Sequence, residues 1–99
     1  MMERYQDEGC QLLIRAFLSL KDKEECIAFL EDLMTQREIA DIAQRLLVAK
    51  LLSEQVVYNK IVEDTGASTA TIARINRACN YGAGGYKTIL ERLKEESKS

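Results

Sequence analysis

Two arginines stand in a stretch that holds no acidic residue from position 65 to position 90. Arg74 carries a planar guanidinium that can donate two parallel hydrogen bonds to a guanine edge, and Arg77 can pair with a phosphate. Thr69 and Ala70 are short enough to touch a thymine methyl group in the major groove. Together these residue types predict recognition of duplex DNA, and the expected DNA-contacting residues are Ser68, Thr69, Ala70, Ala73, Arg74, Arg77 and Lys87.

A helix-turn-helix over about residues 56–79 would place these side chains on one exposed helix. Ser68 reads as the N-cap of that helix, which runs to about Cys79, and its first amides would face a phosphate. Gly66 supplies the positive φ that the turn needs, with Ala67 as a small buried residue after it. The inward apolar contacts are expected from Ile61, Val62, Ile72 and Ile75, while Thr65 stands where an aliphatic residue is commoner.

Apolar residues recur at helical spacing through the rest of the chain. The spacing predicts helices over about residues 4–20 and 55–64, and a C-terminal helix over about 87–96. Capping boxes at Asp22–Glu25 and Thr35–Glu38 predict two further helix starts. We therefore expect an all-α fold of six helices that forms a single DNA-binding domain over residues 1–99. The helix after Thr35 is apolar on more than one side, which favours burial in a dimer.

Composition excludes several other classes of function. The 99 residues include no His, which removes Ser-His and Cys-His catalysis. Three cysteines without a Cys-x-x-Cys pair predict neither a disulfide framework nor a zinc site. We therefore expect no enzyme activity, no cofactor, no metal and no membrane partner. Because no targeting segment is visible, we expect a cytoplasmic location. The net charge of −2 divides into −3 over residues 1–50 and +1 over residues 51–99, which permits DNA binding without requiring it.

The stretch Gly66-Ala67-Ser68-Thr69-Ala70-Thr71-Ile72-Ala73-Arg74 resembles the Trp repressor family. The segment Leu33-Met34-Thr35-Gln36-Arg37-Glu38 resembles the capped central helix of that family. With Asn80-Tyr81-Gly82-Ala83-Gly84-Gly85-Tyr86 included, the chain is similar over about residues 10–95 to the YerC/YecD-like branch of Gram-positive bacteria. The resemblance implies an intertwined all-helical homodimer that presents two reading heads to successive major grooves, about 34 Å apart.

The resemblance also implies an effector pocket, in which tryptophan-responsive members hold an indole between two arginines beside a glycine. Arg74 matches one arginine, and Arg45 or Gln44 lies near the place of the other. Ile75 replaces the glycine and Ala78 replaces a nearby serine. Because a β-branched side chain would fill the space that an indole needs, we expect an effector, if one binds here, to differ from tryptophan.

Two alternatives stay open. The glycine-rich loop at Gly82–Gly85 reads either as a helix cap and turn or as a backbone contact to DNA phosphate, assisted by Tyr81, Tyr86 or Lys87. The acidic N-terminal half is also compatible with a helical protein-interaction module that has kept the fold and lost DNA binding.

Overall fold

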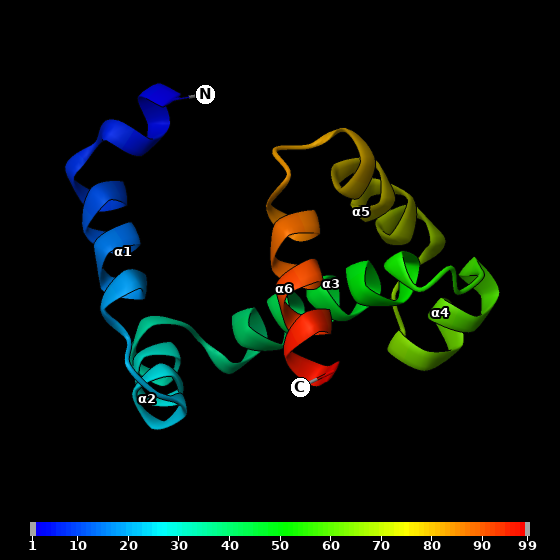
Figure 1. Cartoon of the computed structure of the whole chain (residues 1–99), viewed down its shortest axis with the longest axis horizontal. Coiled ribbons are helices and arrows are strands. Elements are labelled where there is room, and N and C mark those ends of the chain that lie inside the picture. Colours follow the sequence, from blue (N-terminus) through cyan, green and yellow to red (C-terminus); the bar gives the residue numbers. More distant parts are fainter. Residues whose placement is uncertain (1, 99) are drawn as a thin grey trace. The chain divides into compact units, whose positions relative to one another are not determined.

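Side-chain caps and tight turns set the bounds of six α-helices in the computed structural model, which describes residues 2–98 (Figure 1). No strand occurs within residues 2–98. The elements in chain order are a 3₁₀ helix η1 (Met2–Gln6), α1 (Glu8–Ser19), α2 (Lys23–Leu33), α3 (Gln36–Ser53), α4 (Tyr58–Thr65), α5 (Thr69–Tyr81) and α6 (Gly85–Lys98). The chain divides between residues 36 and 37 into two compact units, and the single domain over residues 1–99 stays a prediction.

The first unit is a pair of capped helices. The Asp7 carboxylate accepts from the Gly9 amide at 2.8 Å, so α1 begins at Glu8 and not near residue 4 as predicted. Asp22 accepts from the Glu25 amide at 2.9 Å, which confirms the predicted cap of α2. The rings of Phe17 and Phe29 join the two helices edge to face, with centroids 5.4 Å apart.

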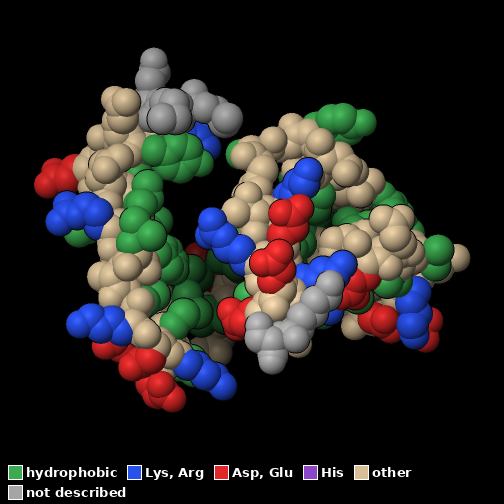
Figure 2. All heavy atoms as spheres, viewed as in Figure 1, with side chains coloured by type: hydrophobic (Ala, Val, Ile, Leu, Met, Phe, Trp, Pro, Cys, Tyr) green, Lys and Arg blue, Asp and Glu red, His purple; other side chains and the backbone are tan. Residues whose placement is uncertain are grey.

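No residue of α1 or α2 is buried. Figure 2 shows hydrophobic side chains in green along the visible face of this unit. Leu12 is 60% exposed and Leu18 is 80% exposed. These two helices therefore carry far more apolar surface than they cover with each other.

The second unit has the buried core, which lies where α3, α4 and α5 meet. Its members are Val48, Ala49, Ile61, Ala67, Ile72 and Ile75. The side chains of Ile61 and Ile72 are fully buried, and each contributes about 1.5–3 kcal/mol through removal of apolar surface from water. Tyr86 and Leu90 of α6 pack against this cluster from outside. The core thus fixes α4 and α5 on the C-terminal half of α3 (Figure 1).

Several helix ends in this unit differ from the sequence-based predictions. The helix expected from residue 55 begins at Tyr58, because Gln55 adopts a left-handed φ of 65° and the Val56 amide turns back to the Leu51 carbonyl. Helix α5 continues to Tyr81, two residues beyond the predicted end. Helix α6 begins at Gly85 instead of residue 87 and reaches Lys98. Its first turn is stabilised where the Thr88 amide donates to the Gly84 carbonyl at 3.0 Å.

Candidate nucleic-acid interface

The turn between α4 and α5 is closed at Gly66, where φ is +76°. Its amide donates to the Val62 carbonyl at 2.9 Å, which ends α4. The Thr65 hydroxyl donates to the Ile61 carbonyl at 2.7 Å and accepts from the Ala67 amide at 3.1 Å. Thr65 therefore holds the turn through hydrogen bonds, where an aliphatic residue would hold it by packing alone. The positive φ of Gly66 and the burial of Ala67 confirm the predicted turn.

The side chain of Gln44 in α3 supports this turn, although it lies 21 positions before Thr65 in the sequence. The Gln44 amide nitrogen donates to the Thr65 carbonyl at 3.0 Å, in partly buried surroundings. A carbonyl at a helix end lacks an intrahelical partner, and Gln44 supplies one here. The family resemblance places either Gln44 or Arg45 at the effector pocket, and the residue types give no sign of the contact between Gln44 and Thr65.

Helix α5 begins with the predicted cap. The Ser68 side chain accepts from the Thr71 amide at 3.1 Å, and its hydroxyl donates to the Thr71 hydroxyl at 3.0 Å. The Ser68 hydroxyl therefore both donates and accepts a hydrogen bond within the cap, which commits this side chain to the start of α5. The opposite side of α5 is anchored by Ile72, which is fully buried, and by Ile75, which is 5% exposed.

The outward face of α5 consists of exposed residues: Thr69, Ala70, Ala73, Arg74 and Arg77. Neither arginine forms an ion pair with any residue that the structure describes. On α4, by contrast, Lys60 pairs with Asp64 at 3.3 Å. The two guanidiniums are therefore free to bind an anion or a base edge. The other residues of this face have short side chains, which would let the helix come close to the floor of a DNA groove.

Two cavities flank α5. The smaller, of about 340 Å³, is lined by Arg45, Thr71, Arg74, Ile75, Ala78 and Tyr86. It brings together four of the five residues expected in an effector pocket and leaves Gln44 out. Tyr86, which the sequence did not assign to it, forms part of its wall.

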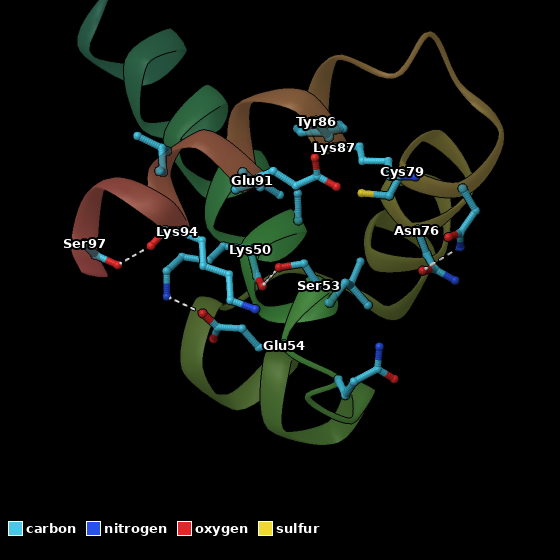
Figure 3. A pocket seen from close by; sticks show the side chains of 16 residues that line it. Lys50, Ser53, Glu54, Asn76, Cys79, Tyr86, Lys87, Glu91, Lys94 and Ser97 are labelled. Carbon is cyan, nitrogen blue, oxygen red and sulfur yellow. Dashed lines mark hydrogen bonds and ion pairs between the residues drawn. The ribbon is translucent and has the colours of Figure 1, made fainter. Parts of the chain in front are cut away.

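The larger cavity, of about 850 Å³, lies between α3, α5 and α6 (Figure 3). Lys87 lines it, together with Lys50 and Lys94, and so lies away from the outward face of α5. Burial raises the pKa of the Cys79 thiol in its wall above the ordinary value. Contact between Lys87 and DNA stays a prediction.

The glycine-rich loop is built as a helix cap. Gly82 ends α5, and its amide donates to the Ala78 carbonyl at 2.9 Å. A Cβ at Gly82 would collide with that carbonyl oxygen, so a side chain there would force the backbone to shift. Gly84 has a φ of +89°. These features favour the cap-and-turn interpretation of the loop.

Residues 2–98 hold no helix long and apolar enough to cross a membrane. In the same part of the chain, no three His, Cys, Asp or Glu side chains are placed to hold a metal ion.

Comparison with known proteins agrees with this geometry. A family model described as Trp repressor protein matches residues 8–94. The uncharacterized protein YerC of Bacillus subtilis (strain 168) is 53% identical over 94 residues, which cover 95% of this chain and 90% of YerC. A solved TrpR-like protein from Eubacterium eligens has a TM-score of 0.88 and 47% identity, with 93% of this chain and 95% of that chain covered. A candidate Trp repressor from Staphylococcus aureus has a TM-score of 0.87 and 38% identity, with 95% and 94% covered.

Replacement of Gly66 by alanine tests the turn. We expect Gly66→Ala to lower the free energy of unfolding by about 1–2 kcal/mol, because an L residue at φ +76° is strained although no atom lies within 4 Å of the new Cβ. Urea denaturation at one protein concentration measures the change. Gly85→Ala is the matched control: its Cβ also meets open space, but the residue is helical, so stability should be kept or raised. Equal stability of the two variants would contradict this account of the turn.

Proposed function

The chain belongs to the Trp repressor family, and we propose that it is a sequence-specific DNA-binding transcriptional regulator. One observation carries this proposal: Arg74 and Arg77 project from the outward face of α5 without an ion-pair partner among the described residues. Family membership supports the same class of function. Such a regulator acts in the cytoplasm, where it reaches duplex DNA.

The two arginines have different roles in this proposal. Arg74 lies in the second turn of α5 and donates two hydrogen bonds to a guanine edge in the major groove. Arg77 lies nearly one turn later and neutralises a phosphate. The backbone amides of Ser68 and Thr69 add the positive end of the helix dipole at a second phosphate.

We further propose that the regulator is a homodimer. Leu12 and Leu18 of α1 are exposed, and so are Ile42, Leu46 and Leu47 of α3. A second copy supplies a cover for this apolar surface. Two-fold symmetry would then present two α5 helices to successive major grooves, about 34 Å apart.

Tryptophan is not the effector in this proposal. Beside Arg74, Ile75 is 5% exposed and belongs to the core, and Tyr86 also occupies the wall of the smaller cavity. The β-branched side chain of Ile75 stands where tryptophan-responsive members have a glycine, so it narrows the wall of this cavity beside Arg74. A smaller effector that uses the guanidiniums of Arg45 and Arg74 is compatible with the lining.

Selection of bound duplexes from a random DNA pool tests the proposed function. We expect a palindromic consensus. Arg74→Ala should lose about 1–3 kcal/mol of discrimination at one base position, because a bidentate contact to that base is removed. Arg77→Ala should weaken binding evenly across sequences and reduce the slope of log affinity against log salt by about 1.

Arg92→Ala is the control, since it removes an exposed arginine from α6. It should leave both the consensus and its affinity unchanged. If no duplex is enriched at low salt, the proposal fails. Co-purification of a protein partner whose binding ignores Arg74 and Arg77 would favour the protein-interaction module instead.

The dimer is tested on α1. We expect Leu12→Gln combined with Leu18→Gln to raise the dimer dissociation constant by at least about 100-fold, because two apolar side chains are lost from each copy. Sedimentation equilibrium should give twice the 11.2 kDa chain mass for the wild type and less for the variant. Arg15→Gln, an exposed change on the same helix, should sediment like the wild type. A wild type that sediments as a monomer at micromolar concentration would contradict the dimer.

Tryptophan dependence is tested by fluorescence anisotropy with the selected duplex. We expect millimolar tryptophan to leave the affinity for DNA unchanged, because the β-branched Ile75 lines the cavity beside Arg74 where tryptophan-responsive members have a glycine. A gain of about tenfold or more would contradict this part of the proposal.

A further inference from the structure

Tyr81, the last residue of α5, is 87% exposed, more than any other large hydrophobic side chain whose exposure the structure gives. It lies about one turn beyond Arg77 and two turns beyond Arg74. At about 100° per residue, Tyr81 is within about 40° of both arginines around the helix axis. The phenol therefore continues the outward face of α5, opposite the buried Ile72 and Ile75.

The neighbouring polar side chains are placed differently. Tyr86 is half-buried and packs against the core, so its ring is committed to the fold. The Asn80 amide nitrogen donates to the Asn76 side-chain oxygen at 3.2 Å. Residues 82–85 are three glycines and one alanine, so no long side chain from this loop covers the phenol. Tyr81 thus projects an aromatic ring and a hydroxyl into solvent at the end of the arginine face.

The distance along α5 from Thr69 to Tyr81 can be compared with the width of the major groove of DNA. Tyr81 lies twelve positions after Thr69, which corresponds to a rise of about 18 Å along the helix axis. The major groove is about 12 Å wide. In the proposed docking, α5 enters the groove with its N-terminal residues at the base edges, so Tyr81 is at or beyond the edge of the groove, where the sugar–phosphate backbone runs.

We propose that the Tyr81 hydroxyl donates a hydrogen bond to a backbone phosphate at the edge of the groove that α5 enters. Tyrosine hydroxyls are among the donors that bind phosphate oxygens in protein–DNA complexes. The contact is uncharged, and it fixes the depth and register of α5 without reading a base. This inference rests on the proposed DNA-binding function.

The test compares Tyr81→Phe with the wild type on the duplex obtained by selection and on duplexes with single base changes. Fluorescence anisotropy is measured over a range of salt concentrations. We expect Tyr81→Phe to bind every duplex about 2- to 10-fold more weakly, as for the loss of one hydrogen bond. The ranking of duplexes and the salt slope should stay the same, since no charge is removed. Arg77→Gln should instead reduce the slope by about 1.

Tyr5→Phe is the matched control, because it removes an exposed phenol hydroxyl from η1, outside the helix-turn-helix. It should bind like the wild type, and both variants should keep the wild-type thermal unfolding curve. The inference is overturned if Tyr81→Phe binds like the wild type, or if it changes the ranking of duplexes. In either case the wild type still selects DNA and the proposed function stands; if the wild type selects no duplex, both fall.

Discussion

The left-handed backbone at Gly66 is the constraint on which the rest of the second unit depends. It ends α4 and starts α5 within three residues, so that Ile61 and Ile72 are both fully buried in one core cluster. The steep junction leaves the arginine side of α5 facing solvent. A different residue at this φ would strain the turn, and a longer turn would separate the two isoleucines.

Helix α3 connects this turn to the remainder of the chain. Val48 and Ala49 bury its C-terminal half in the core, and Gln44 holds the Thr65 carbonyl one turn earlier. The same helix exposes Ile42 and Leu46. In the proposed dimer, one rigid element therefore carries both the apolar surface that a second copy would cover and the hydrogen bond that supports the reading helix.

Local chemistry made much of the second unit predictable. Ser68 and Gly66 have specific backbone roles, and Ile72 and Ile75 repeat at helical spacing, so the turn and the inward face could be found from residue types alone. The hydrogen bond from Gln44 to Thr65 could not be predicted, because the two residues lie 21 positions apart and neither residue type signals the pairing. The start of α4 was missed because glutamine gives no sign of the positive φ at position 55. Tyr81 is 87% exposed whereas Tyr86 packs against the core, and the glycine-rich sequence between them gives no sign of this difference.

Methylation interference on the selected duplex tests the central claim most directly, because methylation of guanine N7 blocks the major-groove edge that Arg74 is proposed to read. The account predicts two symmetric groups of interfering guanines, with centres about 10 base pairs apart, and loss of this pattern in Arg74→Ala. Binding that tolerates methylation at every guanine, or a pattern that Arg74→Ala leaves unchanged, would contradict it.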